Sequence, residues 1–152
     1  MQDTATAIAV IAALVAILSA LYARWQALAA GRANEIALHD NRLRVYNGLV
    51  RFRAHISARG TGIKEEEVWK FAEVAELSEF YFPAGLAPRL NAVFEDALKL
   101  LALNEQWEEL RQYEPEKAKP LVEQRHTLMR GARDECYKIG NELKQHLRVG
   151  GA

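Results

Sequence analysis

The first pattern along the chain is an uninterrupted apolar run near its N-terminus. Residues 4–23 contain no charged side chain. A helix of this length is about 30 Å long, which matches the hydrocarbon core of a bilayer. The run is apolar on all faces, which favours a membrane-spanning helix over a buried core helix. A cleaved signal peptide is the other alternative, but such a peptide needs a basic start and the only charge before the run is Asp3.

Beyond residue 23 the hydrophobic positions recur with a helical period. The stripe from residue 33 to residue 57 consists of Leu38, Val45, Leu49, Phe52 and Ile56, widened by Ile36, Leu43, Tyr46 and Val50. Similar stripes predict a second helix ending near residue 81, a third over 86–111, and a fourth from Pro115 or Pro120 to about 147. In the second helix we expect a buried side formed by Val68, Trp69, Phe71, Ala72 and Ala75.

Turn residues separate these helices and set the fold class. Residues 59–62, the run Phe80–Pro83 and residues 113–116 are typical breaks, since glycine and proline end helices. Short connections favour antiparallel neighbours. The sequence therefore predicts an all-α protein, with an N-terminal transmembrane helix followed by an antiparallel bundle of about four helices.

The same pattern predicts a domain organisation. Residues 1–23 form the transmembrane anchor, residues 24–148 form the helical bundle domain, and residues 149–152 form a disordered tail. The single cysteine, Cys136, cannot form an internal disulfide, which agrees with a reducing compartment.

The residues that flank the apolar run predict its orientation. Tyr22 and Trp25 are amphipathic aromatic side chains suited to the membrane interface, and Arg24 can reach the headgroups. No lysine or arginine precedes the run, whereas four arginines follow it within residues 24–44. The positive-inside rule then predicts a single-pass protein of the inner, or cell, membrane, with the N-terminus outside and the C-terminal domain in the cytoplasm.

Charge is distributed unevenly although the formal net charge is zero. Residues 24–59 hold seven basic and two acidic residues, a net of +5; residues 60–116 hold five and thirteen, a net of −8; residues 117–152 hold eight and four, a net of +4. Three interpretations follow. Opposite charges favour the correct helix pairing, Arg24 and Arg32 bind anionic lipid headgroups, or the acidic helices dock a basic partner. The zero net charge argues against a nucleic-acid partner.

Candidate chemistry is sparse. No two of His39, His55, His126 and His146 are three or four residues apart, the spacing that would place two imidazoles on one helical face for a metal. The chain has no phosphate-binding glycine loop and no Gly-x-Ser-x-Gly motif. We therefore predict no catalytic, metal or cofactor residues and no enzymatic activity.

One local pattern, around Asp40, Arg42 and Tyr46, is a candidate structural or interaction motif. We expect Arg42 to bond an acidic side chain of the acidic helices and Tyr46 to be half-buried. With Asp40-x-Arg42-x-x-Val45-Tyr46 and the later Phe80–Pro83 run, residues 5–110 resemble a group of single-span bacterial membrane proteins that share both motifs. Tyr81 replaces the aliphatic residue usual in that group. The resemblance implies a membrane-anchored helical domain and no assigned activity.

These observations leave three functional hypotheses. The first is a membrane-tethered helical interaction or scaffold module that holds an unknown protein partner, or itself, at the membrane. The second is self-assembly through the bundle and the alanine-rich span, in which small residues allow close helix approach. The third, a ligand-binding or enzymatic bundle, requires a polar pocket that the sequence does not indicate.

Overall fold

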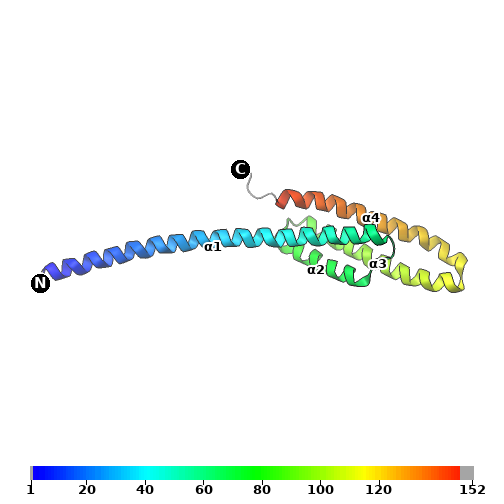
Figure 1. Ribbon diagram of the computed structural model, residues 1–152, viewed down its shortest axis with the longest axis horizontal. Coiled ribbons are helices and arrows are strands. Elements are labelled where there is room, and N and C mark those ends of the chain that lie inside the picture. The colour runs from blue at the N-terminus through cyan, green and yellow to red at the C-terminus, as the bar shows by residue number, and fades with distance from the viewer. Residues whose placement is uncertain (1, 148–152) are drawn as a thin grey trace. The chain divides into compact units, whose positions relative to one another are not determined.

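The computed structural model is all-helical over residues 2–147, the part of the backbone that it describes, with side chains described for residues 13–147. Its four helices are α1 (Gln2–Arg59), α2 (Glu65–Tyr81), α3 (Leu86–Tyr113) and α4 (Pro115–Leu147) (Figure 1). The all-α prediction is confirmed. The predicted disordered tail, residues 149–152, lies outside the described residues.

Helix α1 contains both the apolar run and the first predicted helix of the bundle. Its backbone is helical from Gln2 to Arg59, through Gly31 and Gly48. By internal contacts the chain divides into two compact units, one ending at Leu38 and one beginning at His39. The first unit is the N-terminal part of α1, and the second contains the rest of α1 with α2, α3 and α4.

The helix ends in the second unit follow from local chemistry. Gly60 adopts a positive φ of 61°, and its N–H donates to the Ile56 carbonyl at 2.8 Å, which is how glycine commonly ends a helix. Phe82 is extended, with φ −128° and ψ 162°, because the following residue, Pro83, disfavours the helical region. Pro115 is the first residue of α4, where a missing N–H costs little.

The second unit is a four-helix bundle with a continuous core. The Phe52 and Phe71 rings stack with their centroids 4.2 Å apart and join α1 to α2. A Cβ placed on Gly140 would lie 3.8 Å from the Leu49 side chain, so α4 also packs on α1. Arg89 of α3 forms ion pairs with two glutamates of α4. Helices α2 and α3 are also in contact, and the four helices therefore surround one core.

The hydrophobic stripes predicted the core with three clear exceptions. The buried residues include Val45, Leu49, Phe52, Ile56, Val68, Phe71, Leu90, Val93, Ala132, Cys136, Ile139 and Leu143. Ile36, Leu43 and Trp69 were also expected to be buried, and this prediction is wrong. Ile36 and Trp69 are more than half exposed, and Leu43 is 38% exposed. Trp69 lies one residue past the buried Val68, where the helical rotation already turns a side chain away from the core.

Candidate functional site

Arg42 of α1 joins the C-terminal ends of two other helices, α2 and α4, within the second unit. Its Nε donates to the Tyr81 carbonyl at 3.0 Å and its Nη1 donates to the His146 carbonyl at 3.4 Å. These carbonyls lie in the last turns of α2 and α4, where backbone oxygens have no partner inside the helix and a positive charge is favourable. The guanidinium also lies 5.9 Å from the centre of the buried Phe82 ring. Arg42 is therefore placed to hold the helix ends together.

The predicted acidic partner of Arg42 is wrong, because backbone carbonyls take that role. Two helix C-termini converge at this point, and their unpaired backbone carbonyl oxygens accept hydrogen bonds from Arg42 in place of a carboxylate. Tyr46 is half-buried against the core, as expected, whereas Asp40 is exposed and forms no ion pair among the described residues. The three motif residues do not form one site. The two short motifs meet instead, since Arg42 contacts the Phe80–Pro83 run.

A second polar cluster, around Arg125, was not predicted. Arg125 is only 9% exposed, and its Nε donates to Asn104 Oδ1 at 2.6 Å while its Nη2 donates to Thr61 Oγ1 at 3.3 Å. The Trp107 ring centre lies 4.2 Å from the guanidinium carbon. Burial lowers the pKa of Arg125 from its ordinary value. These contacts fasten the α1–α2 turn to α3 and α4, and a sequence signal existed, because Arg125 interrupts the apolar stripe of α4.

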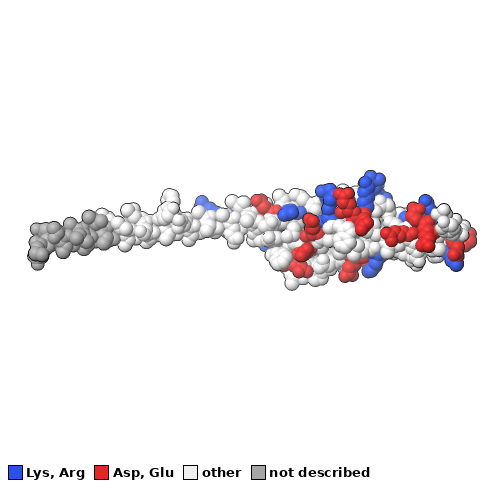
Figure 2. Space-filling model, turned by 90° about the horizontal axis from the view of Figure 1, so that it is seen from below, with Lys and Arg blue, Asp and Glu red and all other residues white. Residues whose placement is uncertain are grey.

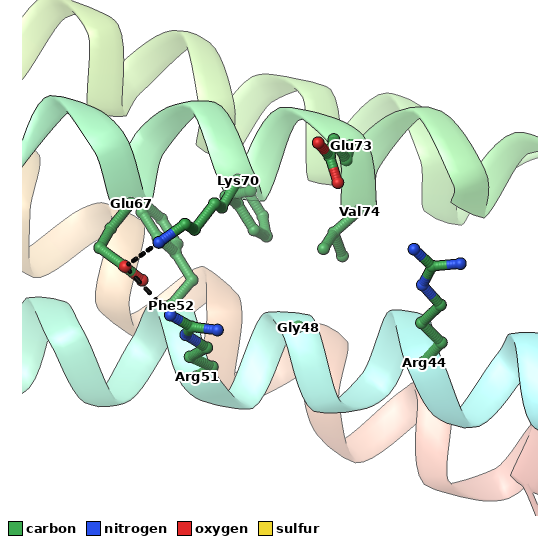
Figure 3. A pocket seen from close by; sticks show the side chains of 9 residues that line it. Arg44, Gly48, Arg51, Phe52, Glu67, Lys70, Glu73 and Val74 are labelled. Atoms are coloured by element: carbon green, nitrogen blue, oxygen red, sulfur yellow. Dashed lines mark hydrogen bonds and ion pairs between the residues drawn. The ribbon is translucent and has the colours of Figure 1, made fainter.

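A partly open cavity of about 200 Å³ lies between α1 and α2 in the second unit. Figure 3 shows Glu67 pointing toward Arg51 and Lys70, with Val74 directed at Gly48. Glu67 accepts from Arg51 at 3.1 Å and from Lys70 at 3.0 Å, and the bond from Lys70 is the largest cause that lowers its pKa. The charged groups at this end of the cavity are therefore already paired with one another.

Reactive groups are not gathered anywhere in the described residues. Within residues 13–147 no group of three or more His, Cys, Asp or Glu side chains could hold a metal ion. Burial raises the pKa of Cys136 to about 12, so its thiol is protonated and a poor nucleophile at neutral pH. The buried thiol therefore acts as a core side chain.

The outer side of α2 carries two exposed aromatic residues with two glutamates between them. We call this the α2 stripe, and it consists of Trp69, Glu73, Glu76 and Phe80, at successive spacings of four, three and four. Trp69 is 53% exposed and Phe80 is 74% exposed. Large exposed aromatic side chains are enriched at protein interfaces, because they bury much area at a small entropic cost. This stripe is the candidate interaction site.

The first unit shows a different surface. Leu18 is 64% exposed and Trp25 is 78% exposed, and Tyr22, Arg24 and Arg32 are exposed as well. In Figure 2 the surface of residues 13–38 is almost entirely white, whereas both charge colours cover the bundle. Within the described residues α1 is the one helix long and apolar enough to cross a membrane, and none of its most apolar stretch is buried.

The chain matches no protein-family model, no curated protein and no solved structure. Two exposed surfaces are the candidates for function, the apolar one on the first unit and the aromatic and acidic one on α2.

Proposed function

We propose that this protein is a membrane-tethered helical interaction module, with one spanning helix and a bundle that binds a protein partner. One observation carries the proposal, namely the exposed apolar side chains of α1 between residues 13 and 28. Exposing such a surface to water costs about 25 cal/mol of free energy for every Å² of apolar area. A bilayer would remove this cost, since twenty uncharged residues match its hydrocarbon thickness.

The flanking residues support one orientation of the span. Tyr22 and Trp25 suit the interface, and Arg24 and Arg32 follow on the side of the bundle, where anionic headgroups would attract them. Basic residues stay on the cytoplasmic side during insertion. The proposal therefore places the bundle in the cytoplasm, at the inner face of the cell membrane.

The bundle supports an interaction role in preference to a chemical one. Its core is apolar and continuous, and its polar clusters at Arg42 and Arg125 are occupied by bonds between helices. Trp69 and Phe80 remain exposed among glutamates. A helical surface with aromatic anchors and a charged rim suits protein binding, so the proposal includes no enzymatic activity and no cofactor.

Two charges introduced into the span test the membrane role. We expect Leu14→Arg with Leu18→Arg to release the full chain from membranes, since each arginine at a helix centre costs about 2.5–3.5 kcal/mol of insertion energy. The measurement is the share of chain that floats with lipid vesicles in a density gradient after alkaline washing.

A matched control adds the same two charges to exposed positions of the bundle. The variant Gln112→Arg with Gln145→Arg should float as the unmodified chain does. Flotation of the Leu14 and Leu18 variant equal to that of this control would contradict the proposal.

A further inference from the structure

Two neighbouring helical segments of the second unit have opposite net charge. Helix α2 contains six glutamates and one lysine, a net of −5. The part of α1 in the same unit, residues 39–59, contains five arginines and one aspartate, a net of +4. Helices α1 and α2 are neighbours in the bundle, and each also has an exposed outer side. On the outer side of α2 the Trp69 ring lies 5.7 Å from the Phe94 ring of α3 and is 53% exposed.

The outer side of α1 is uncharged along its centre. We call it the α1 stripe, and it consists of Leu43, Asn47, Val50 and Ala54. Leu43, Asn47 and Ala54 are exposed and Val50 is half-buried. Arg44 and Arg51 follow Leu43 and Val50 directly and flank the stripe. Arg44 forms no ion pair among the described residues.

The two stripes match in spacing. Both repeat at intervals of four, three and four residues, and each extends about 16 Å from its first to its last position. Within one copy α1 and α2 are antiparallel, with Gly48 against Val74 and Phe52 against Phe71. If two copies are aligned at the same level along α1, the same register places each residue of one stripe opposite one residue of the other.

We propose that the α2 stripe of one copy docks on the α1 stripe of a second copy of this chain. The shared register then pairs two exposed apolar side chains, Phe80 with Leu43, and a large side chain with a small one, Trp69 with Ala54. Large aromatic groups packed against small residues give close complementarity at interfaces.

The charged residues fit the same arrangement. Glu76 lies opposite Asn47, whose amide can donate to a carboxylate, and Glu73 lies opposite Val50. The flanking guanidinium of Arg44 then meets the two glutamates across the interface, whereas Arg51 stays paired with Glu67 of its own copy. Glu73 and Glu76 form no ion pair within the described residues of one copy, so both are free to take these partners.

The geometry also suits chains held in one membrane, and in this the inference rests on the proposed function. Packing α2 of one copy on α1 of the next keeps residues 39–59 of every copy pointing the same way. Such a head-to-tail contact uses two different surfaces and extends into rows. The contact is short and would be weak in solution, but a membrane raises the effective concentration of tethered chains.

Charge changes at the two facing positions test the inference. The full chain, labelled with donor and acceptor fluorophores at its C-terminus, is placed in lipid vesicles, and energy transfer is followed as a function of the protein-to-lipid ratio. We expect Asn47→Glu alone and Glu76→Lys alone to raise the ratio at half-maximal transfer about tenfold or more. The first change places a glutamate opposite Glu76, and the second places a lysine beside Arg44 of the other copy.

Mixing the two variants is the decisive arm. Donor-labelled Asn47→Glu and acceptor-labelled Glu76→Lys should regain the transfer of the unmodified chain. One of the two interfaces in an alternating row then carries a new Lys–Glu pair, and the other is unchanged. The regain also shows that both variants are folded.

Controls carry the same chemical changes at exposed positions outside the stripes. Asn141→Glu on α4 and Glu105→Lys on α3 should associate as the unmodified chain does. The inference is overturned if the unmodified chain shows no more energy transfer than a monomeric spanning helix, or if both stripe variants match their controls. It is also overturned if only Glu76→Lys has an effect, or if the mixture of the two variants fails to recover energy transfer. Each of these results leaves flotation with vesicles unchanged, so it is distinct from a failure of the membrane role.

Discussion

At the scale of single residues, His55 links the end of α1 to the start of α2. Its Nε2 accepts the Lys64 N–H at 3.1 Å, which requires an unprotonated imidazole. Burial is the largest cause that lowers the pKa of His55 below 6.5, while Glu67 raises it and the neighbouring basic residues lower it. The bond supplies one of the N–H groups at the start of α2 with a partner, since no side chain caps that helix.

The lowered pKa predicts a pH dependence of stability. The unfolded chain takes up a proton at His55 near pH 6.5, and the folded chain only at a lower pH. The contribution of the His55 bond is therefore complete above pH 6.5 and is lost as the pH falls from there through the lowered pKa. We expect His55→Gln to reduce the fall in melting temperature between about pH 7.5 and pH 5.5.

The measurement is thermal unfolding of the full chain in detergent, followed by circular dichroism. His126→Gln, at an exposed position on α4, is the control and should keep the unmodified pH dependence. An equal reduction in both variants would rule out the role assigned to His55.

At the scale of helices, α1 and α2 approach most closely at Gly48. A Cβ on this residue would lie 2.3 Å from Val74 Cγ2, closer than two carbon atoms can pack. Val74 cannot turn aside easily, because a β-branched side chain in a helix has one strongly preferred rotamer. A small residue at position 48 is thus a condition for the packing of these two helices.

We expect Gly48→Ala to destabilise the bundle. Overpacking costs about 1–3 kcal/mol, which exceeds the gain of about 1 kcal/mol from replacing glycine inside a helix. Adding Val74→Ala should relieve the overlap and recover part of the loss. Chemical denaturation of the full chain in detergent measures all three variants.

The control is Gly131→Ala on α4, where a Cβ would meet nothing within 4 Å. It should stabilise the protein by about 0.5–1 kcal/mol, because alanine is the better helix former. If Gly48→Ala behaved in the same way, the close approach at Val74 would not exist.

At the scale of the whole bundle, Arg42 holds together segments that are far apart in the sequence. Its two bonds reach the last turns of α2 and α4, across 39 and 104 residues. We expect Arg42→Ala to lower the unfolding free energy by about 1.5–3 kcal/mol, the usual worth of a hydrogen bond to a charged group. Arg42→Lys should be intermediate, because an ammonium keeps the charge and loses the fork of donors.

The control for this change is Arg130→Ala. Arg130 is exposed, and its contacts are with Glu123 and the His126 carbonyl of its own helix. Its removal should cost little, since isolated surface pairs contribute about 0–1 kcal/mol. Denaturation curves that coincide for the Arg42 and Arg130 variants would contradict the structural role of Arg42.

The sequence by itself determined the helices of this protein. The period of Val45, Leu49 and Phe52 fixes the inner side of α1, and glycine and proline fix where helices end, because these are local effects of the backbone. The length of the apolar run and the flanking Arg24 and Trp25 predicted a span from composition alone. These local features do not depend on what lies beside a helix.

Only the tertiary structure decided which side chains meet. It gave Arg42 two helix ends as partners in place of an acidic side chain, and it buried Arg125 beside Trp107. It also left Trp69 exposed, although the sequence suggested a core residue. These outcomes depend on contacts between residues far apart in the chain, and hydrophobic periodicity records only which side of a helix is turned inward.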